Sequence, residues 1–112
     1  MGTLTYGHTV VEFDDRTLAH LQIVIVRKFR AHEGFLMSWL DPIAIGNGRS
    51  SLWLSPDCPL HFKFLGSRSP VVDRAWLELL MQSASSGAGL IVMHEDGTLA
   101  HAVDQHGLRA TY

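Results

Sequence analysis

Hydrophobic and polar residues alternate with a period of two through the centre of the 112-residue chain. This alternation is typical of strands with one buried face. It predicts three strands, Phe35–Leu40, Ser50–Ser55 and Leu60–Leu65. Because short turns rich in glycine and proline separate them, we expect an antiparallel meander, with the face that carries His61 and Lys63 toward solvent.

Two segments instead repeat their apolar residues every three or four positions, which indicates amphipathic helices. The first is expected to start at Asp14, whose carboxylate can cap free N–H groups, and to stop at Gly34. The second starts with the same pattern at Asp73, and Trp76 belongs to its apolar stripe. The β-branched run Ile23–Val26 also fits a buried strand, but the caps and the length favour a helix.

A β-hairpin is predicted at each end of the chain. The first turns at Gly7-His8, where glycine in the first loop position suits a type II′ turn. The second turns at Asp96-Gly97, which favours type I′. The expected strands are Thr3–Tyr6 with Thr9–Phe13, and Leu90–Glu95 with Thr98–Val103.

This order of elements predicts an α+β fold, a mostly antiparallel sheet in the order ββ-α-βββ-α-ββ with two helices packed on one face. The length fits one domain, which we place at residues 1–103, with a C-terminal tail at 104–112. An apolar fraction of 46% and a charged fraction of 18% indicate a buried core rather than disorder.

Net charge and cysteine content limit the classes of function that the chain can have. A net charge of −2 gives no general basic field for nucleic acid. The single cysteine, Cys58, rules out an internal disulfide and a cysteine zinc cluster, and a cytoplasmic location follows naturally. The loop position of this cysteine predicts an inert thiol. No apolar run approaches the roughly 20 residues of a membrane span, so we expect no membrane partner.

Cations gather near the end of the first expected helix, where they complement the helix dipole and also suit phosphate groups. Trp39 and Trp53 offer stacking platforms on a nearby sheet face, although tryptophans in a small domain are usually core residues. The candidate nucleic-acid site comprises Arg27, Lys28, Arg30, His32, Arg49 and Lys63. Because the chain as a whole is not basic, helix stabilisation is the simpler interpretation.

Histidine is the one enriched reactive residue type, with seven copies. His94, His101 and His106 are the candidate metal ligands, since the predicted hairpin would bring the first two together. The simpler interpretation is that they are polar residues on exposed strands and a tail, because no fixed-spacing metal motif is present. The stretch Gly46-Asn47-Gly48 leads into a strand rather than a helix, so it predicts a hairpin turn and not a phosphate loop.

Several segments of the chain up to about Gly89 form a recognisable combination. They are Met1-Gly2-Thr3-Leu4-x-Tyr6-Gly7, Asp15-Arg16-x-Leu18-Ala19-His20-Leu21, Ser38-Trp39, Gly48-Arg49-Ser50-x-Leu52-Trp53-Leu54-x-Pro56, Pro59-Leu60-x-Phe62 and Trp76-Leu77. Together they resemble a family of small actinobacterial proteins of unknown function that often carry the automatic label "ATP-dependent DNA ligase". The resemblance implies a cytoplasmic bacterial protein.

The residues do not support ligase activity itself. Ligases of that class form a lysyl-adenylate on the lysine of a K-x-D-G motif. In Lys63-Phe64-Leu65-Gly66, Leu65 stands in place of the aspartate, and Lys28 matches the motif less well. Nucleotidyl transfer also needs acidic metal ligands around the phosphates, and the usual two catalytic domains exceed this chain length.

We therefore expect a small non-enzymatic binding domain without a cofactor, whose partner is a second copy of the chain or another protein. Tryptophans and edge strands offer the association surfaces. A nucleic-acid-binding accessory module that uses the basic patch is the alternative. A metal-dependent enzyme around His94 and His101 is the third interpretation.

Overall fold

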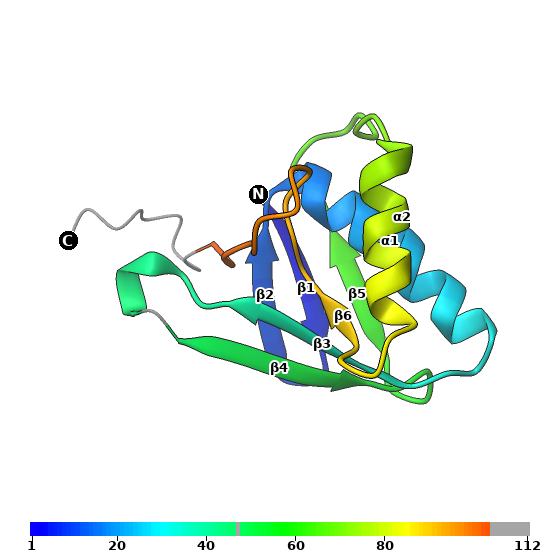
Figure 1. Cartoon of the computed structure of the whole chain (residues 1–112). Helices are drawn as coiled ribbons and strands as arrows, with labels where there is room; N and C mark the ends of the chain where they lie inside the picture. Colours follow the sequence, from blue (N-terminus) through cyan, green and yellow to red (C-terminus); the bar gives the residue numbers. More distant parts are fainter. Residues whose placement is uncertain (47, 104–112) are drawn as a thin grey trace.

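The computed structural model describes residues 1–46 and 48–103, so Asn47 and the predicted tail at 104–112 lie outside the described residues. In the described part, two helices lie on the same side of two three-stranded sheets (Figure 1), which confirms the α+β class. The elements in chain order are β1 (Gly2–Tyr6), β2 (Thr9–Phe13), α1 (Asp15–Arg30), β3 (Phe35–Leu40), the 3-10 helix η1 (Ile43–Ile45), β4 (Arg49–Leu54), β5 (Leu60–Lys63), α2 (Arg74–Ala84) and β6 (Leu90–Ile91).

The predicted N-terminal hairpin is confirmed. Tyr6 of β1 pairs with Thr9 of β2 across a loop of two residues, Gly7 and His8. Gly7 has a φ of 59°, as the first loop position of a type II′ turn requires.

The order β2-β1-β5 of the first sheet shows that the predicted central meander is wrong. β5 pairs antiparallel with β1, with Phe62 opposite Leu4, and not with its sequence neighbour β4. Where the chain leaves β4, the Tyr6 hydroxyl of β1 accepts a hydrogen bond from the Ser55 N–H at 2.8 Å. Pairing with β1 lets the apolar face of β5 pack against the common core, and this burial outweighs the advantage of a short connection.

The second sheet has the order β4-β3-β6. β3 and β4 form the expected antiparallel pair, from Phe35 opposite Leu54 to Leu40 opposite Arg49. η1 lies between β3 and the predicted glycine turn, so the connection is longer than a simple hairpin. β6 runs parallel to β3 and comprises only two residues.

The C-terminal hairpin is correctly placed, but its predicted strands are too long and its turn type is wrong. The Gly97 N–H donates to the His94 carbonyl at 2.9 Å, and Gly97 has a φ of 88°. These are features of a type I turn followed by a glycine bulge. Among the described residues only His32 combines a side chain with a positive φ, so Asp96 does not meet the type I′ requirement. Asp96 instead accepts the N–H and hydroxyl of Thr98 at 2.9 and 2.6 Å.

Residues 100–103 join the two sheets. The Leu40 N–H of β3 donates to the Ala100 carbonyl at 3.0 Å, and the Ala102 N–H donates back to Leu40 at 2.8 Å. The Val103 N–H then donates to the carbonyl of Glu12 in β2 at 2.7 Å. The described chain therefore ends between β3 and β2 and connects them through backbone hydrogen bonds.

Both predicted helix starts are confirmed. The Asp14 carboxylate accepts the Thr17 N–H at 3.1 Å, and α1 begins at the next residue. The Asp73 carboxylate accepts the Trp76 N–H at 2.8 Å, and α2 begins in the same way. In each case a side chain satisfies an N–H group that the helix itself leaves free.

The predicted end of the first helix at Gly34 is wrong. α1 ends at Arg30, four residues earlier, and His32, the second residue after its end, has a φ of 58°. The Glu33 N–H donates to the Lys28 carbonyl, and the His32 N–H donates to the Phe29 carbonyl, both at 3.0 Å. This is a Schellman motif in which histidine occupies the position usually held by glycine.

The core lies between the helices and the two sheets. Fully buried apolar side chains come from both sheets and both helices and include Leu4, Phe13, Leu18, Leu21, Ile25, Met37, Leu54, Leu80 and Leu90.

No helix in residues 1–46 and 48–103 combines the length and the apolar character needed to cross a membrane.

Candidate functional site

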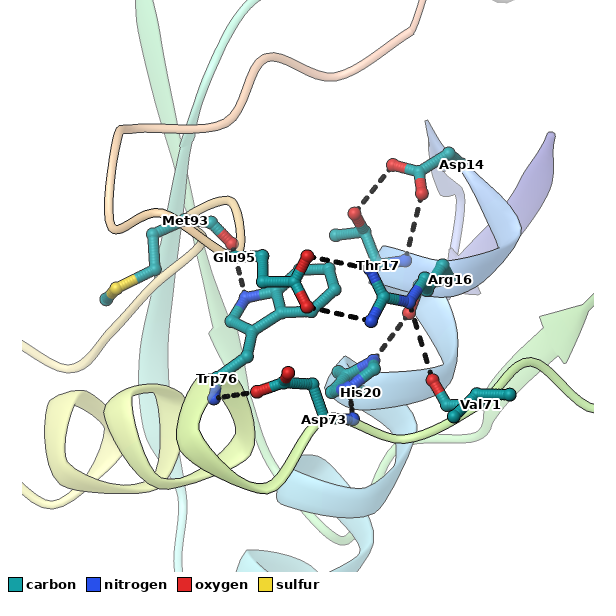
Figure 2. A network of polar contacts seen from close by, with 9 residues as sticks. All are labelled: Asp14, Arg16, Thr17, His20, Val71, Asp73, Trp76, Met93 and Glu95. Carbon is teal, nitrogen blue, oxygen red and sulfur yellow. Dashed lines mark hydrogen bonds and ion pairs between the residues drawn. The ribbon is translucent and has the colours of Figure 1, made fainter.

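A network of polar side chains joins the start of α1, the start of α2 and the loop after β6 (Figure 2). The Arg16 guanidinium donates to both carboxylate oxygens of Glu95, at 3.0 and 2.8 Å, across 79 positions of sequence. The guanidinium carbon also lies 5.3 Å from the centre of the Trp76 ring. The two charged side chains are 40% and 47% exposed, so solvent screens the pair and its main effect is to fix geometry.

His20 is completely buried beside this ion pair, and its ring stacks on Trp76 with ring centres 4.2 Å apart. The backbone N–H of Asp73 donates to Nε2 at 2.9 Å, so Nε2 carries no proton. The proton therefore resides on Nδ1, which donates to the Arg16 carbonyl at 2.7 Å. Both ring nitrogens are occupied, so the arrangement leaves His20 no free nitrogen with which to act as a general base.

The remaining polar atoms of the network are also used internally. The Trp76 indole N–H donates to the Met93 carbonyl at 2.8 Å. The hydrogen bond from the Trp76 backbone N–H is the main reason that the pKa of Asp73 lies below its usual value. Hydrogen bonds from Thr98 likewise lower the pKa of Asp96.

An open depression of about 420 Å³ lies beside the network. Most of its polar lining is already paired, since Asp14 caps α1 and Arg16 binds Glu95. The geometry therefore describes a clamp that holds α1, α2 and the 92–99 loop together. The lining consists of Asp14, Arg16, Thr17, Trp76, His94, Glu95 and Asp96.

Two of the three predicted metal ligands, His94 and His101, lie in the described part of the chain. The His94 N–H donates to Thr98 at 2.7 Å, so His94 faces Thr98 across the hairpin, whereas His101 pairs with Leu40 of β3. His106 lies outside the described residues. Within residues 1–46 and 48–103, no group of three or more histidine, cysteine, aspartate or glutamate side chains is arranged to hold a metal ion.

The basic residues at the end of α1 remain close together. Arg27, Arg30 and His32 are exposed there. Lys28 is different, because its ammonium binds the Glu33 carboxylate at 2.9 Å and its side chain is only 13% exposed.

The other two basic residues of the predicted nucleic-acid site lie elsewhere. Arg49 pairs with Leu40 at the far end of β3, five positions from Phe35, or about 17 Å along the strand. Lys63 pairs with Thr3 at the start of β1. The structure therefore distributes the six predicted residues over three regions and does not bring them into one patch.

Cys58 lies half-buried in the loop between β4 and β5. Its thiol is oriented toward the Pro59 carbonyl at 3.8 Å. The neighbouring Tyr6 hydroxyl has a pKa raised above its usual value, chiefly by burial. Tyr6 already accepts the Ser55 N–H, so this hydroxyl holds the β4–β5 crossing in place.

An apolar cavity of about 280 Å³ opens on the face of the second sheet that is turned away from the core. Leu36, Ile91 and Leu99 line it, and the hydroxyls of Ser38 and Ser51 bind each other across its floor at 2.7 Å. We call this surface the outer face of the β4-β3-β6 sheet.

The two tryptophans predicted to share a sheet face lie on opposite faces. Trp39 is in register with Ser50 and is 7% exposed, whereas Trp53 is in register with Leu36 on the outer face and is 60% exposed. The alternation of side chains along each strand therefore decides whether the tryptophan ring is buried or exposed. The exposed tryptophan is the prominent feature of the outer face.

Sequence reasoning missed the role of His20. The only local signal was its spacing of four from Arg16, which places both on one face of α1. Its other partners, Asp73 and Trp76, are more than 50 positions away. No local pattern could have assigned them.

Residues 1–95 match a protein family described as a domain of unknown function, DUF7882. Neither a curated protein nor a solved structure matches the chain.

Proposed function

We propose that this chain, which belongs to the DUF7882 family of domains of unknown function, is a non-enzymatic binding domain that self-associates through the outer face of the β4-β3-β6 sheet. The observation that carries this proposal is the position of Trp53, 60% exposed on β4. An aromatic side chain of this size buries roughly 150–250 Å² when covered, so its exposure leaves a large apolar surface in water.

The strand that carries this tryptophan supports the proposal. β4 has six residues and, among the described residues, pairs with β3 alone, so it is an edge of its sheet. Natural edge strands are usually protected by lysine, proline, bulges or short length. β4 has none of these within its span, and its only charge is Arg49 at the start.

The neighbouring cavity adds shape to this surface. Its apolar lining by Leu36, Ile91 and Leu99 provides a pocket next to Trp53, and pockets of this kind accept the anchoring side chains of interfaces. Leu99 is itself 50% exposed. A second copy that docks with the same face would cover both exposed side chains at once, as expected of a two-fold symmetric contact.

Sedimentation velocity over a concentration series from about 1 to 200 µM tests this proposal. We expect a reversible dimer that Trp53→Ser weakens by at least tenfold in dissociation constant. Val71→Ser is the matched control, because Val71 is 80% exposed in the loop before α2. A wild-type chain that stays monomeric throughout, or a Trp53→Ser variant that dimerises as well as wild type, would refute the proposal.

A nucleic-acid-binding accessory role in a bacterial cytoplasm is the second candidate. Its support is the exposed group of Arg27, Arg30 and His32 at the end of α1. The resemblance to proteins labelled as ligases adds a context in DNA metabolism. Fluorescence anisotropy with single-stranded, double-stranded and nicked DNA across a salt series tests this role. Binding that falls with salt and is lost in the Arg27→Gln/Arg30→Gln variant would support it.

A further inference from the structure

The first sheet has an open edge on the side opposite the end of the described chain. In the order β2-β1-β5, the outer side of β5 has no strand partner among residues 1–46 and 48–103. Val103, the last described residue, pairs with Glu12 of β2 at the other edge. The edge of β5 is therefore available for pairing.

A groove runs along this edge between β5 and α1. A cavity of about 430 Å³ has Val26 and Phe29 on its helix side and Leu60 and Phe62 on its strand side. A second cavity of about 290 Å³ continues it toward the helix start, between Ile23 and the residues that follow β5. Ile23 and Val26 are neighbours on one face of α1, so the two cavities follow one another along the helix.

The strand presents the right face to this groove. Leu60 and Phe62 point toward the groove and are half-buried, whereas His61 and Lys63 are exposed on the other face, as the sequence predicted. A further strand paired with β5 would place every second side chain on the α1 side as well. Those side chains would enter the two cavities, while the backbone completed the sheet.

The charged side chains that line the groove are positive. Arg30 lines the first cavity, Arg68 lines the second, and both are exposed. Neither they nor Lys63 has an ion-pair partner among the described residues. The nearby Asp15 carboxylate is already occupied by the N–H groups of Leu65 and Gly66, whose hydrogen bonds lower its pKa.

We propose that the groove between α1 and β5 binds an extended acidic peptide segment of a partner protein, in which apolar residues alternate with aspartate or glutamate. The apolar residues would fill the two cavities, whose rims carry Arg30 and Arg68, and the carboxylates would lie on the opposite face of the strand with Lys63. A lysine on an edge strand normally discourages pairing with other strands. Toward an acidic strand the same lysine becomes attractive, so it selects the partner by charge.

The first test uses fluorescence anisotropy with a labelled seven-residue peptide of alternating valine and glutamate. A peptide of alternating valine and lysine is the charge control. We expect the acidic peptide to bind the full chain with a dissociation constant in the micromolar range, and the basic peptide to bind at least tenfold more weakly. No binding of the acidic peptide at 1 mM protein, or equal binding of both peptides, would overturn the proposal.

Variants and mapping then locate the site. The Arg30→Glu/Arg68→Glu variant should lose at least tenfold in affinity, whereas Arg74→Glu, an exposed arginine of α2, should change it less than twofold. Amide chemical shift changes on titration should centre on residues 60–63. An equal loss in the Arg74→Glu variant would indicate a non-specific charge effect and refute the site. Shift changes centred on β4, or displacement of the peptide by a single-stranded oligonucleotide, would assign a different surface or partner and refute the proposal.

This test is independent of the proposed self-association. Trp53→Ser leaves the α1–β5 groove intact, so peptide binding should persist in that variant at wild-type affinity. A wild-type chain that stays monomeric but still binds the acidic peptide would refute the proposed self-association and support the proposed peptide site.

Discussion

Replacement of His20 by leucine should destabilise the fold by about 3 kcal/mol. The change leaves the partly buried Asp73 N–H without its acceptor, and an unsatisfied donor shielded from water costs about 1–3 kcal/mol. It also removes the stacking on Trp76, worth about 0.5–1.5 kcal/mol for an aromatic pair. The Arg16 carbonyl loses less, because it lies inside α1 and keeps its helical partner. Leucine has nearly the volume of histidine, so little cavity is added.

Urea unfolding followed by tryptophan fluorescence measures this loss. At a typical dependence of about 1–3 kcal/mol per molar urea, the midpoint should fall by about 1–3 M. His61→Leu is the matched control, because His61 is exposed on β5, and we expect a change within about 0.5 kcal/mol. A loss below 1 kcal/mol in the His20→Leu variant, with an unchanged urea dependence, would show that the Asp73 N–H finds another acceptor and that the clamp does not depend on the imidazole.

Three further predictions concern the backbone and the caps. His32→Gly should raise the free energy of unfolding by about 0.5–1 kcal/mol in urea, since glycine adopts the positive φ at the end of α1 without strain; a loss of stability would contradict this. Gly89→Ala should cost more than 2 kcal/mol by thermal unfolding, because Gly89 has a φ of 81° and a Cβ there would collide with the Leu36 carbonyl. Since the Trp76 N–H lowers the pKa of Asp73 from 3.8, this group stabilises the fold fully above pH 4 and loses its contribution as the pH falls below that value. Urea unfolding between pH 2.5 and 5 should show that the free energy of unfolding depends less on pH in Asp73→Asn than in wild type, and an unchanged pH dependence would refute the assignment.

The features that sequence predicted well are those that depend on close neighbours. A helix cap needs one side chain and an N–H three residues later, so Asp14 and Asp73 were identifiable from their own surroundings. Gly7 revealed its turn for the same reason. His32 shows the limit of local reasoning, because the hydrogen bonds of Glu33 stabilise a conformation that the side chain itself disfavours.

Strand partners and surfaces depended on distant contacts. β5 pairs with β1, more than 50 positions away, because both strands cover the same core, and nothing within β5 specifies that choice. The clamp likewise needed Arg16 and Glu95 to meet across 79 positions. Alternation along β4 did separate its two faces, but only the pairing with β3 decided that the face with Trp53 points to solvent.

The connection of the two sheets by residues 100–103 has a consequence for synthesis of the chain. Val103 is synthesised about 90 residues after its partner Glu12 of β2, a delay of roughly 5–20 s at ordinary translation rates. During that interval the N-terminal hairpin has an uncovered edge that is open to pairing with other nascent chains. The hairpin gains this contact only after residues 100–103 leave the ribosome, so a slow stretch of codons before that point would prolong the time in which the nascent chain is prone to aggregate.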